Sequence, residues 1–161
     1  MAYNRDEWLP SWADADGDCQ STRHEVLIAE ADGPLAYGAG NCTVTAGVWN
    51  DPYTGSTFTS PSDLDIDHMV PLADAHRSGG WAWSTTKKRA YANDLDHAET
   101  LIAVDDGSNS SKSDRSPDQW LPPNGSYHCT YVIEWVSVKA TWTLTVTSSE
   151  RAALTTVLSN C

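Results

Sequence analysis

Residues 63–72 read Asp-Leu-Asp-Ile-Asp-His-Met-Val-Pro-Leu. In the first half of this stretch apolar residues alternate with acids, which predicts a β-strand whose apolar side faces a core and whose acids face solvent. The strand places Asp67 beside His68 at its end, just before Pro71. A carboxylate is a hard oxygen ligand for a divalent cation, and an imidazole takes up a proton near neutral pH. The pair therefore predicts half of a phosphodiester-cleaving site, although unperturbed surface residues are the commoner explanation for such a pair.

A second polar stretch follows an apolar run later in the chain. Residues 101–104 read Leu-Ile-Ala-Val and predict a strand, and residues 108–115 read Ser-Asn-Ser-Ser-Lys-Ser-Asp-Arg. Pro117 follows Ser116 directly, and Gln119 lies three residues after Ser116; this pattern indicates the start of a helix. We therefore expect Asn109 in the loop or first turn before that helix, with its side-chain oxygen facing Asp67.

Together the two stretches resemble the HNH (ββα-metal) nucleases, in which DIDHxVPL is followed by an apolar strand and by NxxKxD at the start of a helix. Residues 65–71 and 109–114 are also similar to the two ends of the HNH domain of RNA-guided CRISPR nucleases. The wider resemblance is to small secreted bacterial HNH endonucleases and covers nearly the whole chain, the four cysteines included. It implies that His68 is the general base and that Asp67 and Asn109 hold a metal ion.

The length of 161 residues predicts one domain, and the expected strands and helices make it an α+β domain. The resemblance implies a ββα-metal core over about residues 63–120. We expect an N-terminal helix and β-hairpin over 1–62 and a C-terminal helical staple over 121–161. The hairpin is expected from runs at 43–49 and 56–60, and helices are expected at 22–31, 73–76, 85–95, 127–144 and 148–158. The first and last of these helices begin with capping-box patterns, and the run at 127–144 also fits a strand.

The four cysteines contain no CxxC motif, which argues against a zinc ribbon or a redox site. Three disulfide pairings exist; we favour Cys19–Cys42 and Cys129–Cys161, because each bridge closes a local unit. Disulfides are typical of exported proteins, so we expect a secreted protein whose signal peptide has been removed from this sequence. No apolar run approaches the roughly 18 residues that a membrane span needs, so we expect no membrane partner.

The net charge of −12 is the feature that fits a nucleic-acid-binding protein worst. The distribution of charge weakens this objection, because six of the ten basic residues lie between the two motifs. We expect Arg77 and Arg89 to contact phosphates of the substrate. The alternative is that the basic run at 87–89 is an ordinary solvated helix face. The six residues are Arg77, Lys87, Lys88, Arg89, Lys112 and Arg115.

We therefore expect a monomeric, metal-dependent and largely non-specific endonuclease that hydrolyses phosphodiester bonds of DNA, with RNA as the alternative substrate. His68 takes a proton from the attacking water, and Lys112 or Arg115 adds positive charge to the phosphate. A Mg²⁺ ion on Asp67 and Asn109 acts as a Lewis acid, with Mn²⁺ and Ca²⁺ as alternatives.

Two alternatives stay open at this point. A calcium-dependent extracellular binding module would fix structural ions with the acids of residues 14–18 and 63–67. The cluster at 14–18 lacks the spacing and terminal Glu of an EF-hand and is more typical of a turn. That hypothesis gives His68, Asn109 and Lys112 no task. The second alternative concerns Asn93, which lies closer to His68 in sequence than Asn109 does; its position at a predicted helix end favours a capping role, which leaves the metal to Asn109.

Overall fold

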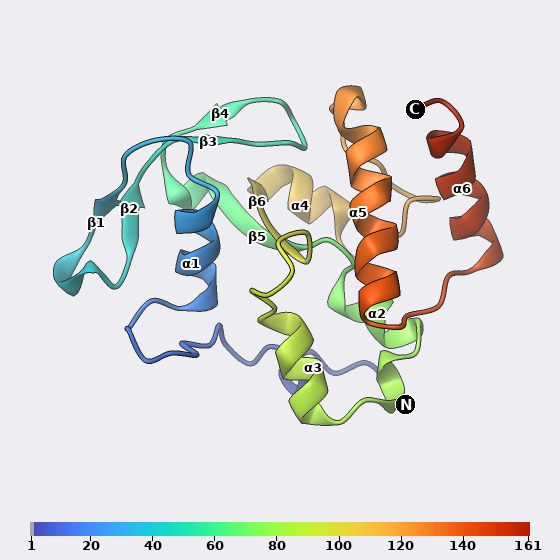
Figure 1. Cartoon of the computed structure of the whole chain (residues 1–161), viewed down its shortest axis with the longest axis horizontal. Helices are drawn as coiled ribbons and strands as arrows, with labels where there is room; N and C mark the ends of the chain where they lie inside the picture. Colours follow the sequence, from blue (N-terminus) through green and yellow to red (C-terminus); the bar gives the residue numbers. More distant parts are fainter. Residues whose placement is uncertain (1) are drawn as a thin grey trace.

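The computed structural model describes residues 2–161 and is built around one β-strand pair with a helix attached to it (Figure 1). Strand β5 (Leu64–His68) pairs antiparallel with β6 (Leu101–Asp105), with His68 opposite Leu101. Helix α4 (Asp106–Lys112) follows β6 directly. Both predicted strands are thus confirmed, and the chain has a β-β-α unit at its centre.

Helix α4 begins earlier than the sequence predicted. The signal for its start is Asp105, whose carboxylate accepts a hydrogen bond from the backbone N–H of Ser108 at 2.7 Å and caps the helix. The expected helix start at Ser116 is wrong, because that residue lies in a turn in which its carbonyl accepts from the backbone N–H of Gln119 at 2.8 Å. Asn109 consequently lies inside α4 rather than before a helix.

The N-terminal third carries α1 (Thr22–Ala29) and two small antiparallel sheets, β1 (Ala36–Tyr37) with β2 (Val44–Ala46) and β3 (Trp49–Asn50) with β4 (Thr57–Phe58). The expected hairpin is confirmed in the β3–β4 pair, whereas the pairing of β2 with β1 was not predicted. The capping box at the start of α1 is wrong. Its N-cap is Ser21 without a side-chain bond, and the hydroxyl of Thr22 donates to the carbonyl of Ala13 at 3.1 Å.

The remaining helices agree closely with the sequence pattern. They are α2 (Leu72–Arg77), α3 (Thr85–Ala92), α5 (His128–Thr141) and α6 (Ser148–Leu158). The capping box of α6 is confirmed, with Thr147 accepting from the N–H of Glu150 while the Glu150 carboxylate accepts from the N–H of Thr147. Short 3-10 turns complete the described chain: η1 (Arg5–Glu7), η2 (Ala39–Asn41), η3 (Pro61–Asp63), η4 (Gly80–Ala82) and η5 (Gly125–Tyr127).

The central strand pair separates two hydrophobic clusters. Leu64 and Ile66 face the cluster of α1 and the small sheets, whereas Ile102 and Val104 belong to an aromatic-rich cluster with α5. Asp67 lies opposite Ile102 and is only 5% exposed, so the prediction that the acids of β5 face solvent is wrong for this residue. An alternating pattern shows that one side of a strand is polar, but it does not show whether another layer covers that side.

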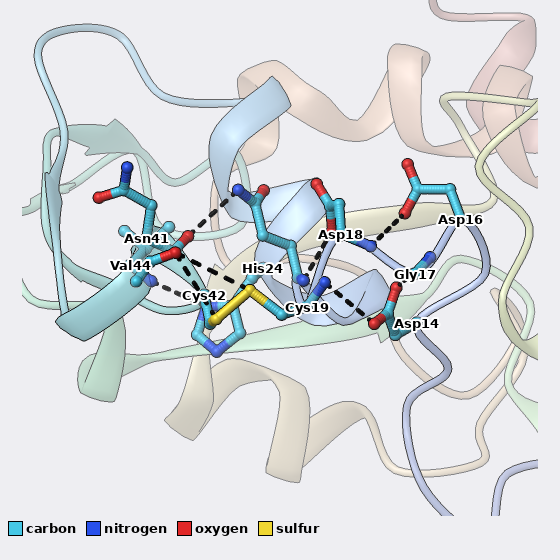
Figure 2. The surroundings of a disulfide bond; sticks show 11 residues. Asp14, Asp16, Gly17, Asp18, Cys19, His24, Asn41, Cys42 and Val44 are labelled. Atoms are coloured by element: carbon cyan, nitrogen blue, oxygen red, sulfur yellow. Dashed lines mark hydrogen bonds between the residues drawn. A yellow bond between two sulfur atoms is a disulfide. The ribbon is translucent and has the colours of Figure 1, made fainter.

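The two disulfides join Cys19 to Cys42 and Cys129 to Cys161, which is the pairing that the local spacing favoured. The first ties the loop before α1 to the segment just before β2 (Figure 2). The second ties the start of α5 to the end of the chain after α6. No helix within residues 2–161 combines the length and the apolar character that a membrane crossing requires.

Candidate active site

An open cleft of about 290 Å³ lies at the end of β5. Three of the residues predicted to carry chemistry line it together: Asp67 and His68 from β5, and Asn109 from α4. Arg5, from η1, and Asp114, which follows α4, also line the cleft. The β-β-α unit therefore brings residues more than 40 positions apart in sequence to one cleft.

His68 is held in a single orientation. Its Nε2 lies 2.9 Å from the backbone carbonyl oxygen of Ala92. Because a carbonyl oxygen can only accept, Nε2 carries the ring proton and Nδ1 has the unshared electron pair. The indole of Trp12 stacks on the imidazole with an interplanar angle of 6°. Burial lowers the pKa of His68 to about 4, so the ring is neutral at pH 7 and can accept a proton.

Asp67 is fixed by two donors that share one carboxylate oxygen. The hydroxyl of Tyr53 donates to Oδ2 at 2.5 Å, and the ammonium of Lys112 donates to the same oxygen. Because both of these donors take Oδ2, Oδ1 is the oxygen available to a ligand in the cleft. Burial raises the pKa of Asp67, and the adjacent positive charge of Lys112 acts in the opposite direction.

Lys112 is fully buried at the last position of α4. Besides its bond to Asp67, its ammonium donates to the backbone carbonyls of His68 at 3.0 Å and Met69 at 2.9 Å. An ammonium has three N–H donors, and these three acceptors use all of them. The expectation that Lys112 adds charge to a substrate phosphate does not fit this geometry; the side chain instead fixes the end of β5 and its carboxylate.

Asn109 presents its amide oxygen to the cleft because a hydrogen bond inside the protein occupies its amide nitrogen. Its Nδ2 donates to Oδ2 of Asp65 at 3.0 Å, which orients the amide and leaves Oδ1 for the cleft. The sequence pattern assigned no role to Asp65, yet this residue positions the predicted ligand. Tyr53 could not be recognised from sequence as the partner of Asp67 either, because it lies 14 positions earlier, in the turn between β3 and β4.

Asn93 lies outside the cleft lining and serves as the C-cap of α3. Its Oδ1 accepts from the backbone N–H of Ala13 at 2.9 Å and from the hydroxyl of Thr22 at 3.1 Å, while its Nδ2 donates to the carbonyl of Arg89 at 3.0 Å. Both polar atoms of the amide are therefore engaged in joining α3 to the N-terminal segment, which is the capping role that its position indicated.

The predicted phosphate contacts do not line the cleft. Arg77 lies at its edge, where its guanidinium bonds Oδ2 of Asp114 at 2.6 Å and the carboxylate of Asp74 at 3.3 Å. Arg89 on α3 and Arg115 after α4 are exposed, and neither belongs to the cleft lining. Of the arginines, the lining contains Arg5 instead, a residue that belongs to no motif and to which the sequence argument gave no role.

The acidic loop before α1 forms a compact turn (Figure 2). The carboxylate of Asp14 accepts from the backbone N–H groups of Gly17 at 2.8 Å and Cys19 at 3.0 Å. The ligand atoms of Asp14, Asp16 and Asp18 lie within 4.8 Å of one another and are exposed. None of these three acids lines the cleft, so the loop is separate from the candidate active site.

Comparison with known proteins agrees with this arrangement. A secreted protein of Arthroderma benhamiae (strain ATCC MYA-4681 / CBS 112371), named "Uncharacterized secreted protein", is 45% identical over 159 residues, which cover 99% of this chain and 76% of the fungal protein. This relative is fungal, so the resemblance is not confined to bacteria. Two disulfides fit an extracellular protein as well. No solved structure matches the chain. Residues 22–157 match the family model described as "GmrSD restriction endonucleases, C-terminal domain", and the chain therefore belongs to this nuclease family.

Proposed function

We propose that this protein is a secreted, metal-dependent endonuclease of the HNH type that hydrolyses phosphodiester bonds of DNA with little sequence preference and acts as a monomer. RNA is the alternative substrate. One observation carries the proposal: a buried, neutral His68 with Nδ1 unprotonated lies in the same cleft as the oxygen ligands Asp67 and Asn109. The family and its secreted relative support a nuclease that works outside the cell.

The donor set fits a hard divalent cation. Asp67 offers Oδ1 and Asn109 offers its amide oxygen, because hydrogen bonds inside the protein already occupy the other polar atom of each side chain. Two protein oxygens with the remaining positions left to water suit Mg²⁺, with Mn²⁺ and Ca²⁺ as substitutes. When bound, such an ion supplies positive charge to the phosphate and to the departing oxygen.

The chain's own groups perform the proton transfer. Nδ1 of His68 takes a proton from the attacking water, and the carbonyl of Ala92 stabilises the resulting imidazolium through the Nε2–H bond. The stacked ring of Trp12 keeps the imidazole from rotating out of line. Tyr53 and Lys112 hold the carboxylate of Asp67 in place, so that the metal site does not need to be ordered by the substrate.

A plasmid-nicking assay tests the proposal. The protein should convert supercoiled plasmid to the nicked form with Mg²⁺ or Mn²⁺, and EDTA should abolish the conversion. The alternative favoured by the acidic loop, a calcium-dependent binding module without catalysis, predicts calcium binding that depends on Asp14 and Asp16 but no nicking with any divalent ion. Absence of cleavage of both DNA and RNA with Mg²⁺, Mn²⁺ and Ca²⁺ would overturn the endonuclease assignment.

A further inference from the structure

Among the residues that line the cleft, every charged side chain except one is paired with a side chain of opposite charge. Asp67 is paired with Lys112, and Asp114 is paired with Arg77. Arg5 also lines the cleft and forms no ion pair with any carboxylate of residues 2–161. No other lysine or arginine among these residues belongs to the lining. A strand that enters the cleft therefore meets a single uncompensated positive charge.

The residues that follow Arg5 hold its backbone in place. The Arg5 carbonyl accepts from the N–H groups of Trp8 and Leu9, each at 2.9 Å. Trp8 is fully buried in the aromatic cluster, and Glu7 forms an ion pair at 2.6 Å with the ammonium of Lys88 on α3. Asn4 caps the short turn through a bond from the backbone of Asp6. The main chain at Arg5 is thus fixed, whereas the residue itself is exposed and can reach a ligand.

A guanidinium at this place suits the phosphate of a nucleic acid. Its planar fork donates two parallel hydrogen bonds to phosphate oxygens, and it stays charged at every relevant pH. The overall charge of −12 makes a local cation more important, because the rest of the surface repels a polyanion. The arginines that the sequence pattern offered for this task are either engaged at the edge of the cleft, as Arg77 is, or lie outside its lining, as Arg89 does.

We propose that Arg5 binds a phosphate of the nucleic-acid strand in the cleft, beside the bond that is cleaved. This inference rests on the proposed function and extends it to a residue outside the family match, which spans residues 22–157. The segment before the matched domain would then complete the active site, because it supplies the substrate-binding cation that the matched domain does not place in the cleft.

The test compares Arg5→Ala and Arg5→Lys with the parent on fluorescent DNA and RNA oligonucleotides. Arg151→Ala is the matched control, since Arg151 is exposed on α6 and does not line the cleft. Loss of a charge-assisted phosphate contact should lower kcat/KM roughly 10- to 100-fold in Arg5→Ala. Arg5→Lys should recover part of the loss, because it restores the charge without the planar fork. The control should match the parent, and equal melting temperatures should show that all variants fold.

A binding measurement separates this inference from the proposed function. With a phosphorothioate oligonucleotide, the slope of log K against log salt concentration should be less negative by about 0.7 to 0.9 in Arg5→Ala than in the parent, as expected for the loss of one phosphate contact. A parent that cleaves while Arg5→Ala matches it in both assays would overturn the role of Arg5 alone. A parent that does not cleave but binds in an Arg5-dependent way would overturn the enzymatic proposal alone. Absence of both cleavage and Arg5-dependent binding would overturn both.

Discussion

Replacing Lys112 by Met should strongly destabilise the protein, because it leaves the carboxylate of Asp67 buried without its cation. The side chain of Lys112 is 0% exposed and that of Asp67 is 6% exposed. Removing one partner of a buried ion pair typically costs about 3 to 5 kcal/mol. The carbonyls of His68 and Met69 also lose their donor. For a protein of this size, such a loss lowers Tm by on the order of 10 °C.

The pH dependence of the loss gives a sharper test. Without Lys112, burial raises the pKa of Asp67 further above its value in the unfolded chain, so the folded state holds more protons. Stability of the variant should therefore fall as pH rises from about 4 toward 8, and its deficit relative to the parent should be smallest at the acid end. Urea unfolding with the disulfides intact, measured from pH 4.5 to 8, provides the comparison.

A double variant provides the control for this reasoning. Lys112→Met combined with Asp67→Asn has no buried charge at this site, and it should regain a large part of the stability that Lys112→Met loses at pH 8. A loss of less than about 1 kcal/mol for Lys112→Met at pH 7, or a further loss of stability on adding Asp67→Asn, would contradict this role of the buried ion pair.

Two further predictions concern other residues. Asn109→Ala should require far more Mg²⁺ or Mn²⁺ for cleavage than the parent, because it lacks one of the two proposed metal ligands. Asn93→Ala should keep the parental metal dependence and lose about 1 to 3 kcal/mol of stability, because its capping hydrogen bonds are gone. Metal titration of cleavage and thermal melting of both variants check this, and the reversed pattern would assign the metal ligand to Asn93. Burial raises the pKa of Glu30 to about 7, so between about pH 4.5 and 7 the folded protein keeps a proton on this carboxyl that the unfolded chain has released. The free energy of unfolding therefore falls as pH rises through this range. Glu30→Gln keeps an acceptor for the N–H of Ala103 and should be about 1 to 2 kcal/mol more stable than the parent at pH 8 but not at pH 4.5; an equal difference at both pH values would contradict this.

The elements that local chemistry specifies could be predicted from the sequence. The capping box at Thr147 and Glu150 fixed the start of α6, and the alternating residues of β5 and the apolar run of β6 indicated two strands. The start of α4 was missed because Asp105 ends a strand and caps a helix at once. A strand and a helix without a loop between them leave no turn signal, and the sequence pattern then favoured the proline-containing turn after Ser116.

The site could be predicted only as far as its motifs extend. His68, Asp67 and Asn109 meet in one cleft because the β-β-α unit brings its two ends together. The direction of Lys112 could not be read from its spacing, since a lysine at the end of a helix reaches solvent as readily as a buried carboxylate. Arg5 carries no local signal, because its place at the cleft depends on tertiary packing of the N-terminal segment.

The most direct test of the central claim is the cleavage rate of His68→Ala under single-turnover conditions at saturating Mg²⁺, compared with the parent and with Arg151→Ala. We predict that His68→Ala cleaves about 10²-fold or more slowly than the parent, because it lacks the group that takes the proton from water. Mn²⁺ binding measured by calorimetry should remain close to that of the parent, because Asp67 and Asn109 are unchanged. A His68→Ala protein that cleaves at the rate of the parent would contradict the role of His68 as general base.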